Sequence, residues 1–255
     1  MENLWQILLF ICPCTFLAGL IDSSAGGGGL ISLPAYLVAG LPPHAALATN
    51  KCSSTFGTMF STANFIRNGK INFRAALPAA VMALLGSHIG AKLSMLANET
   101  VLRYIMIVAV IAIAIFITVK KDFGSIDNSG KYTKTRMFIM SVIIGFVIGM
   151  YDGFFGPGTG TFLILSFSAF AGFDLLTASG NAKLVNLASN VAAFLTFAFS
   201  GEILFAIGIP AALTGIAGNI VGSNLALKKG SKYIRPMFIL ALTLLLLKLI
   251  SESFF

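Results

Sequence analysis

The sequence predicts an all-α protein, a polytopic bundle of transmembrane helices made of two inverted repeats. Of its 255 residues, 57% are hydrophobic and 10% are charged, whereas soluble domains contain about 25% charged residues. Equivalent residues recur in its two halves, and the basic residues of those halves occupy opposite connections. This composition excludes an ordinary soluble enzyme. We expect no nucleic-acid partner, because membrane proteins concentrate Lys and Arg in cytoplasmic loops, which accounts for the net charge of +8.

The internal repeat is visible as identical residues at a nearly constant spacing. Near the start of each half the spacing is 130 positions, and from Gly40 onward it is 132 positions without a gap. Biased composition alone would not align lysine, proline and arginine in one register. The matched pairs include Asp22 with Asp152, Gly26 with Gly156, Gly28 with Gly158, Lys51 with Lys183, Pro78 with Pro210 and Arg103 with Arg235.

Each half divides into five apolar segments. They are 4–21, 30–39, 45–66, 73–96 and 101–119 in the first half, and 137–151, 161–171, 178–199, 203–227 and 233–250 in the second. A full span needs about 20 residues, so the second segment of each half is too short to cross a bilayer. We therefore expect about eight full spans and two short half-helices or tilted short helices, each following a glycine-rich break. Residues 1–119 form the first repeat, 120–136 a cytoplasmic linker and 137–255 the second repeat.

The basic residues indicate that the second repeat is inverted. The connection between the third and fourth segments holds Arg67, Lys70 and Arg74 in the first half, but only Glu202 in the second. The next connection has the opposite bias: Lys92 and Arg103 correspond to Lys228, Lys229, Lys232 and Arg235. Because basic loops stay inside, these biases predict opposite orientations. The expected location is the bacterial cytoplasmic membrane, with many passes.

Cysteine and histidine give no sign of a metal site or a disulfide framework. There are three cysteines and two histidines, and Cys12, Cys14 and Cys52 match no paired zinc pattern. No metal and no cofactor is therefore expected. The repeated GxxxG pairs, Gly86 with Gly90 and Gly218 with Gly222, predict close helix packing and no chemistry.

The glycine-rich turns are candidate anion sites. Gly26, Gly27 and Gly28 precede the short segment of the first half, and Gly156 and Gly158 precede that of the second. Backbone amides exposed in such a turn need partners in an apolar environment, and the positive end of the following half-helix favours an anion.

Two lysines lie within predicted spans, where a charge is costly unless it has a function or a partner. Lys51 and Lys183 could snorkel to the interface, contact an anion, or neutralise Asp22 and Asp152. Polar residues near them would complete the hydrogen bonds of a bound anion: Thr49, Asn50, Asn181, Asn186 and Asn190. Asp22 or Asp152 could carry a coupling proton or cap a half-helix.

Three pieces carry a family resemblance: AGGGGLISLPAYLVAGLPPHAALATNK at 25–51, YDGFFGPGTGTF at 151–162 and NAKLVNLASN at 181–190. They resemble the TauE/SafE sulfite exporter family of membrane permeases. The resemblance implies secondary transport of small anions such as sulfite, organosulfonates or carboxylates.

Inverted repeats with broken helices and intramembrane charges also favour a secondary transporter that works by alternating access. An intramembrane aspartyl enzyme using Asp22 and Asp152, or a passive anion channel, is the alternative. The expected partners are a small anion and the lipid bilayer, and the sequence allows a homo-oligomer.

Overall fold

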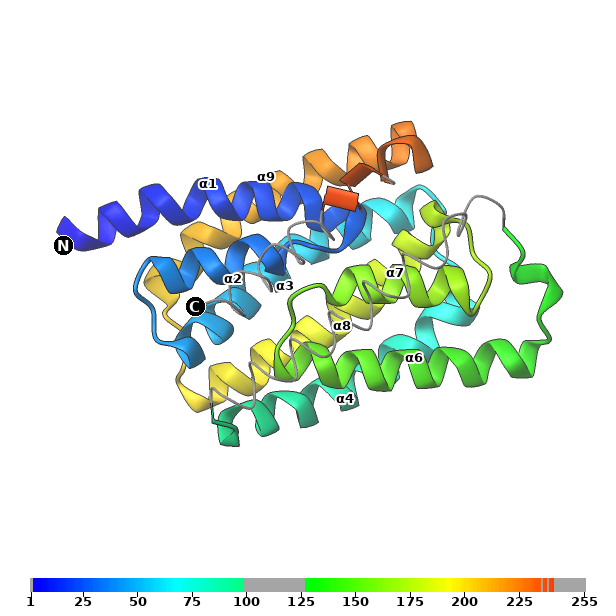
Figure 1. Ribbon diagram of the computed structural model, residues 1–255, viewed down its shortest axis with the longest axis horizontal. Helices are drawn as coiled ribbons and strands as arrows, with labels where there is room; N and C mark the ends of the chain where they lie inside the picture. Colours follow the sequence, from blue (N-terminus) through cyan, green and yellow to red (C-terminus); the bar gives the residue numbers. More distant parts are fainter. Residues whose placement is uncertain (1, 99–126, 235, 238, 241–255) are drawn as a thin grey trace.

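The computed structural model describes residues 2–98, 127–234, 236–237 and 239–240 (Figure 1). Six long helices of these residues lie side by side. They are α1 (Glu2–Ala25), α3 (Pro43–Arg67), α4 (Phe73–Leu96), α6 (Lys134–Phe154), α8 (Leu175–Ser200) and α9 (Phe205–Lys229). Two short helices, α2 (Gly29–Val38) and α7 (Thr159–Ala169), follow the glycine turns, and a 3-10 turn η1 (Ser129–Lys131) precedes α6.

Local signals explain where several helices begin and end. The side chain of Asn72 accepts hydrogen bonds from the first backbone amides of α4, and that of Asp174 does the same for α8. These are typical N-cap interactions. At the end of α8, Gly201 takes a left-handed conformation with φ of 78°, the usual way to stop a helix. Helix α4 covers 73–96, as predicted.

The packing order of the helices relates the two halves by a pseudo-twofold symmetry. The packing contacts order the long helices as α1, α9, α3, α8, α4, α6, and Figure 1 shows α1 and α9 on one side of α3 and α8, and α4 and α6 on the other. Exchanging α1 with α6, α9 with α4 and α3 with α8 reverses this order and leaves the set of neighbouring pairs unchanged. Helix α1 runs from the left of Figure 1, whereas its counterpart α6 runs from the right. This is the arrangement expected of inverted repeats.

The GxxxG pairs occupy equivalent contacts in the two halves. On α4, Gly86 and Gly90 lie against the backbone of α6, while on α9 their counterparts Gly218 and Gly222 lie against the backbone of α1. Added Cβ atoms would overlap those backbones, so only glycine allows this approach. The helix-packing role predicted for these motifs is confirmed.

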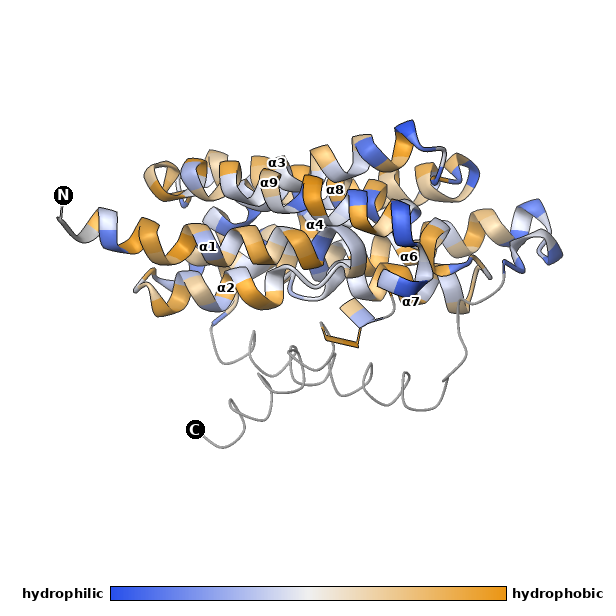
Figure 2. Ribbon diagram, turned by 90° about the horizontal axis from the view of Figure 1, so that it is seen from above, coloured by the Kyte–Doolittle hydropathy of each residue, from blue (hydrophilic) through white to orange (hydrophobic). Residues whose placement is uncertain are grey.

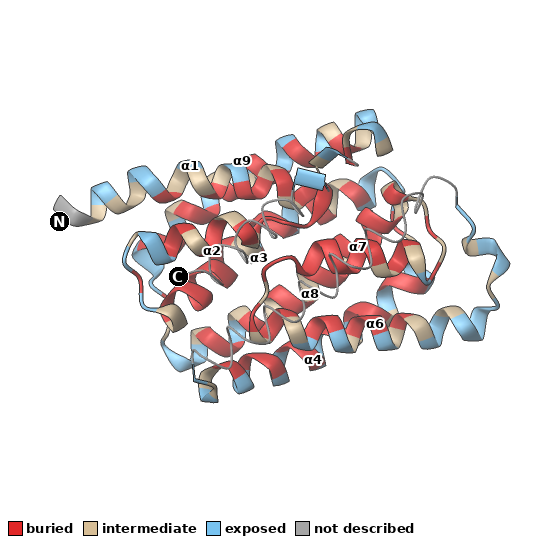
Figure 3. Cartoon of the chain, in the orientation of Figure 1, coloured by how far each residue is buried: buried red, intermediate tan, exposed pale blue. Residues whose placement is uncertain are grey.

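The surface and interior follow the rule for a protein in lipid. Many large apolar side chains point outward, among them Leu9, Leu17, Val147, Phe199 and Leu213, and the outer helices in Figure 2 are predominantly hydrophobic. Buried residues line the inner faces of α3, α7 and α8 (Figure 3), and they include many Ser, Thr and Asn. The polar groups of this chain therefore concentrate inside the bundle.

Five described helices are long and apolar enough to cross a membrane: α1, α4, α6, α8 and α9. Helices α2 and α7 have 10 and 11 residues, so the prediction of two short apolar helices is confirmed. Helix α3 has the length of a span, with 25 residues, but it is not among those apolar enough because its inner face is polar. The predicted span 101–119 lies outside the described residues, and most of 233–250 does too. The repeat boundaries at 119 and 137 stay a prediction.

Candidate functional site

The two glycine turns meet in the middle of the bundle. Gly26 lies against Gly160 so closely that a Cβ atom on either glycine would overlap the other's backbone. The hydroxyl of Thr161 donates to the carbonyl oxygen of Ala25 over 2.8 Å, which joins the start of α7 to the end of α1. Four helix ends thus meet here: the C-termini of α1 and α6 and the N-termini of α2 and α7.

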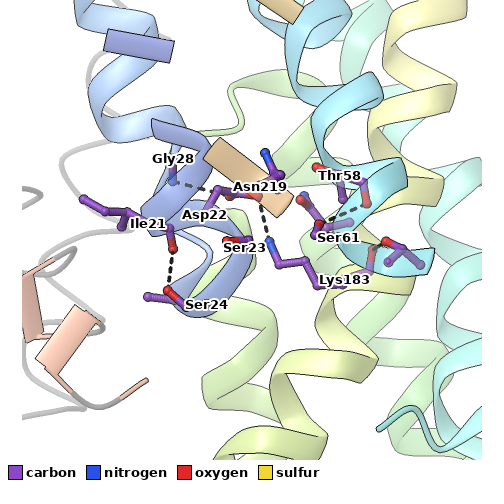
Figure 4. Close-up of polar contacts among 12 residues, drawn as sticks. Ile21, Asp22, Ser23, Ser24, Gly28, Thr58, Ser61, Lys183 and Asn219 are labelled. Atoms are coloured by element: carbon purple, nitrogen blue, oxygen red, sulfur yellow. Dashed lines mark hydrogen bonds and ion pairs between the residues drawn. The ribbon is translucent and has the colours of Figure 1, made fainter. Parts of the chain in front are cut away.

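Two lysine–aspartate pairs cross between the halves at this point. Lys51 Nζ on α3 lies 2.7 Å from Asp152 Oδ1 on α6. Lys183 Nζ on α8 lies 2.7 Å from Asp22 Oδ2 on α1 (Figure 4). Each lysine thus pairs with the aspartate of the other half, and the two pairs are equivalent under the exchange of halves. A buried charge needs such a partner.

Burial rules out the snorkelling interpretation of the lysines. Lys51 is 3% exposed and Lys183 is 0% exposed, and both ammonium groups end on carboxylates inside the bundle. Of the three readings that the sequence allowed, neutralisation of the aspartates is therefore what this structure contains.

The aspartates lie on helices, one residue beyond the ends of the apolar segments 4–21 and 137–151 that the sequence predicts. Helix α1 continues through Asp22 to Ala25, and α6 continues through Asp152 to Phe154. A carboxylate near a helix C-terminus is unfavourable for the helix dipole, so the facing lysines have a second stabilising effect. Asp22 also accepts a 3.4 Å hydrogen bond from the amide of Gly28, the N-cap of α2.

Two small adjoining cavities surround the ion pairs. One, with a volume of about 20 Å³, has an almost wholly polar lining that includes Lys51, Asp152, Asn50, Asn186 and Asn190. The other, about 30 Å³, lies beside Asp22 and has a mixed lining of hydroxyl and amide groups and apolar atoms. Asp22, Gly29 and Ser54 line both. Volumes of this size accommodate one or two water molecules.

Three predicted asparagines line the smaller cavity. Lys51 Nζ donates to Asn190 Oδ1 over 3.1 Å, and Asn190 Nδ2 in turn donates to Asn186 Oδ1 over 3.3 Å. Asn50 Oδ1 accepts a 2.6 Å hydrogen bond from the hydroxyl of Ser32. Lys51 thus sits at the end of a chain of amide side chains.

Thr49 and Asn181 have a different role from the predicted anion contact. Thr49 Oγ1 accepts from the amide of Leu204 just before α9, and Asn181 Oδ1 accepts from the amide of Asn72 just before α4. The two interactions are equivalent under the 132-residue spacing. Neither residue lines the two cavities. Both side-chain oxygens thus serve a neighbouring backbone amide in this structure, as buried polar side chains commonly do, and their assignment to an anion stays a prediction.

The predicted glycine amides are partly occupied. The amide of Gly26 donates to the carbonyl of Asp22, that of Gly28 to the carboxylate of Asp22, and that of Gly156 to the carbonyl of Tyr151. In this conformation these three amides are not available to an anion. In the first turn, Gly27 lies between Gly26 and Gly28 in the sequence. In the second turn, Gly158 is the N-cap of α7 with φ of 81°.

Two polar residues of the larger cavity, Thr15 and Asn219, were not among the candidate site residues predicted from the sequence. Both are buried, and Thr15 bonds to Thr214 over 2.7 Å. Asn219 could have been found from the sequence, because it is an isolated asparagine inside an apolar segment and the repeat matches it with Ser87. Ser54 and Thr58 were noticeable only as the counterparts of Asn186 and Asn190 in the repeat.

The comparison with known families shows the family of this chain. The family described as Sulfite exporter TauE/SafE matches residues 11–249. The chain belongs to this family. It is 38% identical to the "Probable membrane transporter protein ORF9" of a Sinorhizobium species, over 97% of this chain and 94% of that protein.

Two further relatives support the same membership. The chain is 36% identical to the "Probable membrane transporter protein YfcA" of Escherichia coli K12, over 97% and 90% of the two chains. A "Probable membrane transporter protein" of Haemophilus influenzae is 32% identical over 96% of both chains. No solved structure matches the chain. Family, relatives and apolar helices together make this a multi-pass membrane protein of a transporter family.

Proposed function

We propose that this TauE/SafE chain is a secondary transporter for small anions that works by alternating access. One observation carries the proposal: Lys51 and Lys183 are buried where broken helices from both halves meet. Intramembrane charges at the junction of inverted repeats are typical of transport sites near the middle of the bilayer.

The smaller cavity is the better candidate for the anion. There Lys51 provides the positive charge, while Asn186, Asn190 and Asn50 are amide side chains that can turn donors toward an oxyanion. Sulfite, a sulfonate or a carboxylate presents several acceptor oxygens, which suits a lysine surrounded by amides. The family description favours the sulfur-containing anions within this class.

The size of the cavity favours alternating access over a passive channel. A volume of about 20 Å³ holds water but not an organosulfonate, so the halves must move apart before the anion enters. The two ion pairs cross between the halves, and any such movement changes them. Opening and ion-pair exchange are therefore coupled.

The two aspartates do not form the acid pair of an aspartyl enzyme. Such a pair shares one proton between adjacent carboxyl groups, whereas here each carboxylate faces a lysine at 2.7 Å. This pairing of each carboxylate with a lysine supports transport over hydrolysis.

Counterflow in proteoliposomes tests the proposal. Purified protein is reconstituted with internal sulfite, ethanesulfonate or sulfoacetate, and uptake of the labelled anion is measured. We expect exchange above that of empty liposomes for at least one of the three, and a loss of about tenfold or more in Lys51→Met, as for an interaction of roughly 1.4 kcal/mol. Lys51→Arg should also be impaired, because the guanidinium places its donors differently from an ammonium group.

The matched control is Lys229→Met, which removes an exposed lysine at the end of α9 and should exchange at the wild-type rate. Folding of each variant is checked by size-exclusion chromatography in detergent. Wild-type protein that is folded but moves none of the three anions would refute the proposal, as would normal exchange by folded Lys51→Met.

A further inference from the structure

The centre of the bundle is electrically balanced. Two lysines face two aspartates, and the two helix N-termini that begin here, of α2 and α7, are matched by the C-termini of α1 and α6. The partial charges of these four helix ends have opposite signs and offset one another. A bound anion would therefore add one uncompensated negative charge inside a low-dielectric bundle, which is costly.

We infer that the transporter carries each monovalent anion together with one proton, and that the carboxylate of Asp152 binds this proton. The inference rests on the proposed transport function and specifies its coupling. It assigns different roles to two aspartates that the repeat makes equivalent.

The contacts of the two carboxylates distinguish them. Both oxygens of Asp22 are engaged, Oδ2 by Lys183 and Oδ1 by the amide of Gly28. In Asp152 only Oδ1 is engaged, by Lys51, and Oδ2 is a buried atom without a hydrogen-bond partner among the described residues. A buried polar atom left unpaired requires an explanation. Oδ2 can accept a proton without losing an existing hydrogen bond.

Among the described residues, the cavity that Asp152 lines has two other charged side chains, Lys51 and Asp22. Lys51 faces it from α3, and α8 presents the neutral amide of Asn190 to the same lysine. The remaining charged groups of the centre, Asp22 and Lys183, already form an ion pair with each other. On α4, Ser87 lies against Gly153, while His88 bonds to Thr196 on α8. On α7, Thr159 donates to the carbonyl of Gly156.

The coupling step follows from this geometry. A proton from water binds Asp152 Oδ2 and converts the carboxylate to a neutral carboxyl group. The ion pair with Lys51 is then released, and the anion takes the place of the carboxylate beside the ammonium group. Before the step the centre has two positive and two negative charges; after it, the two lysines face Asp22 and the anion. The total charge is unchanged, so the loaded centre can cross between its two open states.

This scheme predicts electroneutral symport. One proton and one monovalent anion move together, so a pH difference drives accumulation whereas a membrane potential does not. For coupling of one to one, a pH difference of about one unit supports roughly tenfold accumulation.

Ethanesulfonate is the suitable probe because it stays a monovalent anion over the neutral pH range, unlike sulfite. Proteoliposomes holding wild-type protein receive labelled ethanesulfonate with an inward proton gradient, with a potassium-valinomycin potential of either sign, or with neither. Counterflow without any gradient is measured in the same preparations. Entry of protons is followed with a trapped pH-sensitive dye.

We expect the proton gradient alone to drive accumulation, with about one proton entering per anion. In Asp152→Asn, which imitates the protonated carboxyl group, accumulation and proton entry should be lost while counterflow persists. Asp22→Asn should transport ethanesulfonate more slowly, and its accumulation of the anion should still respond to the proton gradient. The control Asp174→Asn, at the N-cap of α8, should match wild type because asparagine caps a helix as well as aspartate does.

Each failure has its own signature. Wild type without counterflow of ethanesulfonate, sulfite or sulfoacetate would refute the proposed function. If ethanesulfonate alone fails to exchange, the inference of one proton per monovalent anion is overturned while the proposed function stands. Wild type with counterflow but with no response to the proton gradient, or with accumulation driven by potential, would overturn the coupling alone. Retention of proton drive in folded Asp152→Asn would overturn the assignment of the proton to Asp152. If Asp152→Asn does not fold, the dye measurement and the potential test on wild type still decide the stoichiometry.

Discussion

Lys51 and Lys183 are equivalent by sequence, yet their surroundings differ. Lys51 contacts both Asp152 and Asn190, and its carboxylate partner has an unpaired oxygen. Lys183 meets an aspartate that is also held by the N-terminus of α2. The partners of a buried ion pair decide how readily the pair can separate. The partners described here favour separation of the Lys51–Asp152 pair. The other pair is better suited to hold α1 and α8 together.

Removing one member of the Lys51–Asp152 pair should cost more stability than removing both. Lys51→Met leaves Asp152 as a buried unpaired charge, and breaking such a pair costs roughly 3–5 kcal/mol. Adding Asp152→Asn removes that charge, so the double variant should regain most of the thermal stability in detergent while anion exchange stays lost. A double variant that exchanges anions normally would show that this pair is only structural, and additive losses in stability would show that the pair is not coupled.

The short helices owe their position to the glycine turns. Gly26 adopts φ of 75° and touches Gly160, so a side chain there meets both a conformational and a steric penalty. The turns thereby bring the starts of α2 and α7 to the ion pairs. An ordinary loop with bulkier residues would keep these helices apart.

The variants Gly26→Ala and Gly69→Ala separate the two penalties. Both glycines have positive φ, 75° and 64°, but an added Cβ at Gly69 meets nothing within 4 Å. Gly69→Ala should therefore lose only the cost of a left-handed residue, roughly 1–2 kcal/mol, and transport normally. Gly26→Ala should lose more thermal stability and also anion exchange, because α7 must move away. Equal effects of the two variants on both measurements would show that close contact of the turns is unimportant.

At the scale of the whole molecule, the repeat in the sequence predicted the inversion of the two halves and the two short helices. It could not predict that Lys51 pairs with Asp152 rather than with Asp22, because a linear spacing does not say which half an ion pair joins. Nor could it separate Thr49 and Asn181 from Asn186 and Asn190. All four are buried polar residues near a lysine, and only the packing shows that the first two serve backbone amides.

The inverted arrangement makes a prediction about the sides of the membrane. Helices α3 and α9 run in the same direction, since Thr49 meets Leu204 and Asn64 meets Ser223, whereas α8 runs against them, since Lys51 meets Asn190 and Thr62 meets the carbonyl of Lys183. The ends of α3 and α9 therefore share one side, and the end of α8 lies on the other. Basic residues surround the first two ends, which places that side in the cytoplasm.

Single cysteines test this in a variant whose native cysteines, Cys12, Cys14 and Cys52, are replaced by alanine. Asn68→Cys after α3 and Ser231→Cys after α9 should react with a membrane-impermeant maleimide only after the cells are opened. Glu202→Cys after α8 should react in intact spheroplasts. A cytoplasmic protein is the control for leakage, and anion exchange confirms that the cysteine-free background is native. Labelling of all three positions from one side would contradict the inversion, because helices that pack in opposite directions across one bilayer cannot end on the same surface.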